Sequence, residues 1–253
     1  MDNNITKKVL KNEYDFDALF TTKLVADTYI RFFDDKLPDM YDHNFTEVFN
    51  DLSPEDFSKI KAISEERKEN HIKIVSFNRL KVLSILGYEH NVILTMAADT
   101  IQPKPLKIQN ITYKNLKESP ELINDFLRLV SKYDAPLYGA DFVAREMYRY
   151  FLVAKEENGF NYFGCYQDNK LIAVCYGFNS NGVTGLDGLL VDEPYRHKNI
   201  ASNLVKYIQQ YYQNCPIYLH ADDEDTPKYL YQNIGFKTLY QRHEYLLLKN
   251  KDK

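Results

Sequence analysis

The stretch VDEPYRHKNIASNLV, residues 191–205, places three basic side chains where a helix is expected to begin. Arg196, His197 and Lys198 stand directly before a helical pattern that starts at Asn199. The N-terminal end of a helix carries a partial positive charge, so cations are locally unfavourable there. Either the turn is simply solvated, or an anion binds to it.

This turn has the residues that a phosphate-binding loop requires. Such a loop needs backbone N–H groups that converge on the anion, a residue that accepts positive φ, and a helix behind it. Asn199 stands where glycine would be expected, and asparagine tolerates the left-handed region better than most residues. Ala201 is small enough for a ligand to approach the first helical turn. The conflict between the cations and the helix dipole would disappear once a pyrophosphate is bound.

Two motifs of the chain resemble those of the GNAT N-acetyltransferase superfamily. The segment LDGLLVDEPYRHKNIASNLVKYI resembles the acetyl-CoA motif, a strand followed by R/Q-x-x-G-x-G/A and a helix. The segment KYLYQNIGF resembles the second motif, L-Y-x-x-x-G-F, which carries a tyrosine near the thioester sulphur. The motifs occur in family order, about 30 residues apart, and together they are far more specific than either alone. The resemblance covers residues 108–248.

The resemblance implies roles for particular residues. Strand residues Leu189, Leu190 and Val191 would present backbone groups to the acetyl and pantetheine arm of acetyl-CoA. The pyrophosphate loop would consist of Arg196, His197, Lys198, Asn199, Ile200 and Ala201. Tyr231 would contact the cofactor and act as general acid, although a merely packed tyrosine is the alternative. The chain departs from the family pattern in having Asn199 for the first glycine. It also has Glu224 where asparagine is frequent, so no cofactor contact is assigned to Glu224.

Acetyl transfer from a thioester to an amine requires two proton transfers. A free alkyl amine has a pKa of about 10, so a base should accept a proton as the amine attacks. The departing thiolate, with a pKa of about 8.5, should be protonated by a donor such as tyrosine. Asp187 is the first choice for the base and Glu193, beside the loop, is the second. A carboxylate that only bonds a strand edge would explain Asp187 equally well. The oxyanion would need a fixed N–H, expected from residues 188–191.

The elements around these motifs predict an α/β fold. Helices are expected from Ser119, over 141–155, over 199–212 and near 227–234, with strands at 160–167, 171–178, 183–191, 216–221 and 240–248. Gly185 and Gly188 inside the strand 183–191 suggest a bulge or a close backbone approach. This order fits a mixed, largely antiparallel sheet flanked by helices, the acyl-CoA N-acyltransferase fold.

The first part of the chain suggests a second, related domain. Pro103 and Pro105 favour an extended tether, so we place a boundary between domains 1–105 and 106–253. Before it, a helix is expected from Ser53 and a strand over 72–77, followed by RLKVLSILGYEHNVILTMA, which echoes PKYLYQNIGFKTLYQRHEYLLL. Aligning Gly87 on Gly235 puts Leu83 where Tyr231 stands. The sequence thus predicts two tandem domains, the first a degenerate, non-catalytic GNAT-like or accessory domain.

The composition of the chain bears on its partners, its location and metal binding. The net charge of −4 argues against a nucleic-acid partner. No apolar run approaches the length of a membrane span, and the first residues are too polar for a signal peptide, so we expect a cytoplasmic protein without a membrane partner. Its three cysteines are read as reduced core thiols, and its six histidines lack metal-ligand spacing, so no metal is expected.

The sequence therefore predicts an acetyl-CoA-dependent N-acyltransferase that acts on a small-molecule or peptide amine. A homodimer is left open. The rival hypothesis is a non-catalytic acyl-CoA-binding regulatory module.

Overall fold

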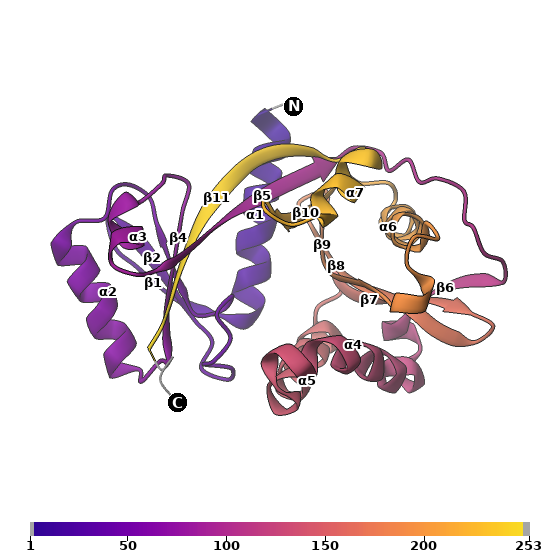
Figure 1. The fold of residues 1–253 in the computed structure, drawn as a ribbon, viewed down its shortest axis with the longest axis horizontal. Coiled ribbons are helices and arrows are strands. Elements are labelled where there is room, and N and C mark those ends of the chain that lie inside the picture. The colour runs from indigo at the N-terminus through magenta and orange to yellow at the C-terminus, as the bar shows by residue number, and fades with distance from the viewer. Residues whose placement is uncertain (1–2, 250–253) are drawn as a thin grey trace. The chain divides into compact units, whose positions relative to one another are not determined.

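The computed structural model describes residues 3–249, which form two compact units (Figure 1). Unit 1 comprises the chain up to Phe16, Met96–His220 and Thr226–Leu239, and unit 2 comprises Asp17–Thr95, Ala221–Asp225 and the chain from Tyr240 onwards. These units differ from the expected contiguous domains 1–105 and 106–253. Helix α1 (Asn3–Phe20) and strands β5 (Glu89–Ala98) and β11 (Lys237–Leu248) each contribute residues to both units.

Unit 1 is built on a mixed, largely antiparallel sheet. Its strands are β6 (Ile111–Asn115), β7 (Phe160–Gln167), β8 (Lys170–Ser180), β9 (Val183–Val191) and β10 (Ile217–Asp222). They are hydrogen-bonded in the order β6-β7-β8-β9-β10, followed by the end of β5. Neighbours from β6 to β9 are antiparallel, whereas β10 joins β9 in parallel. The strands expected in this region are confirmed.

Helices cover both faces of this sheet. They are α4 (Ile123–Tyr138), α5 (Ala140–Glu156), α6 (Ile200–Tyr211) and the short α7 (Pro227–Asn233). Tyr150 of α5 packs against Tyr176 of β8, with ring centroids 5.5 Å apart. The ring of Tyr212, just after α6, lies 3.3 Å from where a Cβ on Gly177 would be. Successive strand residues face opposite sides, so α5 and α6 lie on opposite faces of the sheet (Figure 1).

Helix α4 begins later than expected. Two 3-10 turns, Leu116–Glu118 and Pro120–Leu122, precede it, so it begins at Ile123 rather than at Ser119. It continues to Tyr138 and includes Pro136. A proline in the last turn removes one helical hydrogen bond without breaking the rest of the helix.

Helix α1 was not predicted, because polar residues occupy part of its buried face. Its buried positions Val9, Asn12 and Glu13 nevertheless share one face by helical spacing. Asn12 donates to Ser180 Oγ at 2.8 Å and accepts from Tyr218 Oη at 2.7 Å. Side-chain amide bonds therefore tie α1 to the sheet of unit 1. Over the described residues, no helix is long and apolar enough to cross a membrane.

Unit 2 has a sheet with the strand order β1-β2-β3-β4-β11-β5. Its other strands are β1 (Thr22–Val25), β2 (Tyr29–Phe33), β3 (Phe45–Val48) and β4 (His71–Ser76), and its helices are α2 (Pro54–Glu66) and α3 (Lys81–Ile85). The expected helix start at Ser53 is confirmed, because its side chain accepts from the backbone N–H of Asp56. Strands β1 to β3 were not predicted.

The two segments that echo each other in sequence end their helices in the same way. In α7, the N–H of Phe236 bonds to the carbonyl of Tyr231 and the N–H of Gly235 to that of Gln232. In α3, the N–H of Tyr88 bonds to the carbonyl of Leu83, and Gly87 again takes a positive φ. Both are Schellman caps, each followed by a long strand. The echo is therefore a repeated helix–cap–strand motif.

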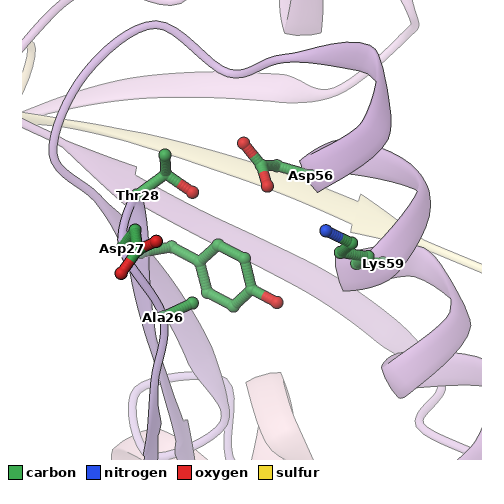
Figure 2. A pocket seen from close by; sticks show the side chains of 6 residues that line it. Ala26, Asp27, Thr28, Asp56 and Lys59 are labelled. Carbon is green, nitrogen blue, oxygen red and sulfur yellow. The ribbon is translucent and has the colours of Figure 1, made fainter.

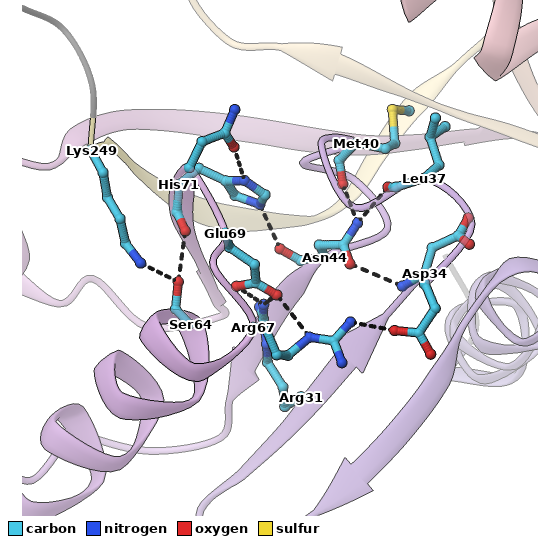
Figure 3. Close-up of polar contacts among 12 residues, drawn as sticks. Arg31, Asp34, Leu37, Met40, Asn44, Ser64, Arg67, Glu69, His71 and Lys249 are labelled. Atoms are coloured by element: carbon cyan, nitrogen blue, oxygen red, sulfur yellow. Dashed lines mark hydrogen bonds and ion pairs between the residues drawn. The ribbon is translucent and has the colours of Figure 1, made fainter.

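A buried charge network holds the core of unit 2 together (Figure 3). Arg31 of β2 donates to both carboxylate oxygens of Glu69, at 2.6 and 2.5 Å, and each side chain is only 1% exposed. Arg67 bonds the same carboxylate at 3.2 Å and reaches Asp35 at 2.6 Å. Burying an ion pair is unfavourable unless its remaining hydrogen-bonding capacity is satisfied. The second arginine meets part of that demand.

Candidate functional site

Strand β9 carries a β-bulge at the position where the sequence suggested one. Val174 of β8 pairs with Leu190, but the next pair is Tyr176 with Asp187. Two residues of β9, Gly188 and Leu189, therefore stand opposite the single Cys175. Gly188 has φ +62°, and a Cβ there would lie 2.6 Å from the ring of Tyr176. Only glycine fits this backbone.

Gly185 is required because the side chain of a neighbouring strand lies close to its backbone. A Cβ at Gly185 would lie 2.7 Å from Tyr218 Oη, on the neighbouring strand β10. Both interior glycines thus have the roles that the sequence suggested.

Strands β9 and β10 pair over only a short length. Their parallel register runs from Thr184–Ile217 to Leu186–Leu219 and has no further pair among the described residues, although β9 continues to Val191. Beyond the bulge, Asp192 donates its N–H to Ile172. The backbone groups of Val191, one residue earlier, must therefore point away from β8. Val191 therefore presents its N–H on the side where β10 no longer pairs, while its carbonyl on that side accepts Arg196 Nε.

The basic turn after β9 adopts the conformation of an anion-binding loop. His197 and Asn199 both have φ +63°, and Ile200 begins α6 directly after Asn199. Alternation between left- and right-handed residues makes neighbouring N–H groups converge. In the described part of the chain, the N–H groups of residues 197–202 have no hydrogen-bond acceptor. The turn can therefore offer several donors to one anion.

The cations of the turn lie on its surface. Arg196 donates from Nε to the carbonyl of Val191 at 3.1 Å, and its guanidinium lies 5.3 Å from the centre of the Tyr133 ring. Lys198 Nζ lies 5.2 Å from the centre of the Tyr195 ring. Cation–π contacts of this kind hold a positive charge in place while leaving it accessible. Ile200 is buried and Ala201 is half-buried, as the first turn of a packed helix requires.

Tyr133 and Asp192 hold the start of the turn in place through hydrogen bonds. Neither residue was predicted from the sequence. Tyr133 Oη donates to Asp192 at 2.8 Å and accepts the N–H of Glu193 at 2.6 Å. Burial would raise the pKa of Asp192, but hydrogen bonds from Lys132 and Tyr133 and the charges of Lys132 and Lys170 lower it on balance. Asp192 is thus held as a carboxylate at the start of the turn. Its only signal in the sequence was its position, as an acid between a strand and a basic loop.

The proline-containing tether is bound to the turn rather than extended freely beside it. Asn199 Nδ2 donates to the carbonyl of Pro105 at 2.7 Å, and the N–H of Lys107 bonds to Lys198 at 3.2 Å. Asn203 of α6 reaches the carbonyl of Lys104 at 2.9 Å. Asn199 therefore does more than replace a glycine, because its side chain fixes residues 104–107 against the loop.

The two carboxylates proposed as bases have different surroundings. Asp187 is exposed, but it accepts Tyr176 Oη at 2.7 Å and the N–H of Gly188 at 2.7 Å. Burial and the carboxylate of Asp187 hold the pKa of Tyr176 well above its ordinary value, so the phenol stays protonated. The N–H of Gly188 is thereby occupied, which removes it from the donors expected for an oxyanion. Glu193 is exposed and opens the 3-10 turn Glu193–Tyr195.

Tyr231 lies in α7 and is half-buried. Its ring packs against Phe236, with centroids 5.8 Å apart, across the Schellman cap. This contact is the usual companion of such a cap, so packing alone explains where the ring lies. Its hydroxyl remains a candidate proton donor.

The pocket of unit 2 shown in Figure 2 has a different character. It is lined by Ala26, Asp27, Thr28, Tyr29, Asp56 and Lys59. Lys59 is paired with Glu55 at 2.8 Å, and the lining includes none of the residues singled out by the motifs. No group of three His, Cys, Asp or Glu side chains in the described residues is placed to hold a metal ion.

Comparison with known proteins identifies the fold. Residues 126–236 match the model of the acetyltransferase (GNAT) family. No curated protein matches the chain. A functionally unknown conserved protein from Staphylococcus epidermidis is 15% identical, with a TM-score of 0.77 over 90% of this chain and 94% of that one. A GCN5-related N-acetyltransferase from Kribbella flavida is 12% identical, with a TM-score of 0.61 over 96% and 94%.

A tandem GNAT protein from the clavulanic acid biosynthesis pathway is 9% identical, with a TM-score of 0.55 over 89% of this chain and 79% of that one. At such low identity these structures show the fold alone. That fold is the mixed, largely antiparallel open sheet flanked by helices that the sequence predicted, and the tandem protein spans most of the chain.

Asn199 provides a direct test of how the turn is built. Asn199→Gly should keep the left-handed conformation and lose only the bond to Pro105, whereas Asn199→Ala should lose both. We expect the alanine variant to be less stable than the glycine variant by about 1 kcal/mol. Urea unfolding of the two variants beside the wild type measures this difference. Equal stabilities would show that positive φ at Asn199 carries no penalty.

Proposed function

Since residues 126–236 belong to the GNAT acetyltransferase family, we propose that the chain transfers an acetyl group from acetyl-CoA to a primary amine. The amine, of a small molecule or peptide, attacks the thioester directly in a ternary complex. One observation carries the proposal: a bulged strand that parts from its neighbour leads straight into a basic turn with convergent N–H groups. Each half of that arrangement suits one end of acetyl-CoA.

The turn suits the pyrophosphate. The N–H groups of residues 197–202 lack acceptors within the described chain, and they lie at the positive end of the 12-residue helix α6. Arg196 and Lys198 add two positive charges beside them. Ala201 has a side chain small enough for a phosphate to approach the helix. We therefore propose residues 196–201 as the pyrophosphate loop.

The strand suits the pantetheine and acetyl groups. Leu189, Leu190 and Val191 are half-exposed, and the N–H of Val191 points away from β8. An amide-containing arm could bond to β9 there in the way that a neighbouring strand would. Because Gly188 already bonds Asp187, the N–H of Val191 is the better candidate to stabilise an oxyanion.

The proposed reaction moves two protons. As the N–C bond forms and the C–S bond breaks, the attacking nitrogen loses a proton and the thiolate gains one. Tyr231 is proposed as the donor to sulphur. Asp187 and Glu193 are the carboxylates that the sequence proposed as the base. Leu83 occupies the position of Tyr231 in the repeated motif of unit 2, so we propose no catalytic role for that motif.

Release of free CoA thiol decides between an enzyme and a binding module. Acetyl-CoA would be incubated with spermidine, kanamycin or a tripeptide with a free N-terminus, and thiol followed with a chromogenic disulfide reagent. We expect amine-dependent release with at least one acceptor class. Tight acetyl-CoA binding without release from any amine would instead favour the non-catalytic regulatory module.

Charge reversal of the turn tests the phosphate contact. Arg196→Glu should remove one charge-assisted bond and add repulsion, weakening CoA binding about 30-fold, or about 2 kcal/mol. Titration calorimetry with CoA measures the loss. Arg128→Glu is the matched control, because Arg128 is an exposed arginine of unit 1 that pairs with Asp125 on α4. Unchanged CoA affinity in a folded Arg196→Glu variant would show that this turn is a solvated basic patch without a phosphate contact.

Tyr231→Phe tests the proton donor while keeping the ring that packs on Phe236. Acetyl-CoA should bind as before, and the chemical step should slow about 10²-fold. Turnover at saturating acetyl-CoA measures the effect. Tyr229→Phe is the control, since Tyr229 lies in the same helix and is 57% exposed. If turnover stays within about threefold where chemistry limits the rate, Tyr231 only packs.

A further inference from the structure

Glu13 is a buried carboxylate for which the reaction described so far has no use. It lies on the buried face of α1 with Val9 and Asn12, and only 6% of it is exposed. A leucine or alanine would fill such a position by packing alone. Burying an ionised carboxylate is strongly unfavourable unless a partner compensates it.

The partner of Glu13 is a histidine on the edge of the proposed site. His220 Nε2 lies 3.3 Å from Glu13 Oε1, and the side chain of His220 is 41% exposed while that of Glu13 is 6% exposed. The imidazole therefore has a buried carboxylate on one side and solvent access on the other. The ring of Tyr218, two residues earlier on β10, packs edge-on against it at 5.8 Å.

His220 lies where β9 and β10 stop pairing. Leu219 is the last residue of β10 in register with β9, opposite Leu186, so the next residues along the two strands are His220 and Asp187. The bulge at Gly188 follows immediately. His220 faces the same side as Tyr218, whose ring lies over Gly185. Residues 185 and 187 of β9 share that side as well.

We propose that His220 accepts the proton of the attacking amine and that Glu13 is its positioning residue. The inference rests on the proposed acetyl transfer. With Nε2–H donated to Glu13, Nδ1 is the basic nitrogen of the neutral ring. When the N–C bond forms and the C–S bond breaks, one proton passes from the amine to His220 and one from Tyr231 to sulphur. The carboxylate of Glu13 stabilises the imidazolium that results, as the acid of a catalytic triad does.

This assignment gives Asp187 a structural role. Its two oxygens accept Tyr176 Oη and the N–H of Gly188, which fixes the bulge rather than the reacting amine. The charged and titratable groups near His220 include Glu13 from α1, which forms an ion pair with the imidazole, and Tyr218 from its own strand, whose ring packs against it. Asp187 of β9 comes next after the last pair between β9 and β10.

The pH dependence of kcat in the full chain tests the pair, with the amine that gives the fastest thiol release among spermidine, kanamycin and the tripeptide. The base must be neutral to accept a proton, so activity should fall at acid pH. His220→Asn should lower kcat about 10²-fold and remove this dependence on pH. Glu13→Gln removes the carboxylate that positions the imidazole and stabilises the imidazolium, so kcat should fall, by less than in His220→Asn, while the KM for the amine stays the same. Acetyl-CoA affinity should stay unchanged in both variants.

Asp15→Asn is the matched control. Asp15 is a carboxylate of the same helix that accepts from Ser180 Oγ at 3.1 Å and Asn181 Nδ2 at 2.5 Å, and it should keep the wild-type pH profile. If folded His220→Asn retains kcat within about threefold and the same dependence on pH, the pair is structural and acetyl transfer still stands. If the wild type itself releases no thiol, both proposals fall. Should His220→Asn fail to fold, the turnover of Glu13→Gln decides alone: a kcat equal to that of the wild type overturns the pair.

Discussion

The site in unit 1 depends on the bulge at Gly188. A regular strand would carry β9 alongside β10 to its end and satisfy every backbone group between them. The extra residue of β9 breaks this register just after Leu186, where pairing with Leu219 stops. Tyr176 fills the space that a Cβ on Gly188 would need, and Asp187 bonds both Tyr176 and the backbone of Gly188. One glycine therefore decides where the sheet opens and where backbone groups become available to a ligand.

The basic turn is held in place by groups that are far away in the sequence. Tyr133 on α4 supports Asp192 and Glu193 through a single hydroxyl, and the tether around Pro105 is bonded to Asn199. A loop with two non-glycine residues in the left-handed region is strained by itself, and such strain persists only where surrounding contacts compensate for it. The hydrogen bonds from α4 and from the tether supply those contacts. The loop is consequently preorganised before any anion arrives.

Local patterns in the sequence predicted the parts of this structure that local physics determines. The strand 183–191, its glycines, α6 and the repeated cap at Gly87 and Gly235 all follow from spacing and from residues that accept positive φ. Helix α1 could not be found in this way, because its buried face uses Asn12 and Glu13, whose partners lie more than a hundred positions later in the chain. Strands β1 to β3 are short. All of β1 is exposed, and buried polar residues in β2 and β3 hide the alternation that marks a strand.

The residues of the candidate site also fall into those that local sequence patterns predict and those that only the fold brings together. The residues of the turn were predictable because a phosphate loop is a contiguous motif with a known backbone requirement. Tyr133, Asp192 and the pair Glu13–His220 were not, since each becomes meaningful only when the fold brings separate elements together. A lone buried glutamate in a polar helix gives no signal until its partner is seen.

The position of β11 has a consequence for how the chain is made. Unit 2 places β11 between β4 and β5, yet β11 begins at Lys237, long after β5 ends at Ala98. Domains usually fold in the order in which the ribosome produces them. Here the facing edges of β4 and β5 must wait for the strand that will separate them, and unpaired edges of this kind are templates for aggregation. A nascent chain of this protein is therefore most vulnerable while the segment between β5 and β11 is being translated, and folding of unit 2 ends only after β11 has been produced.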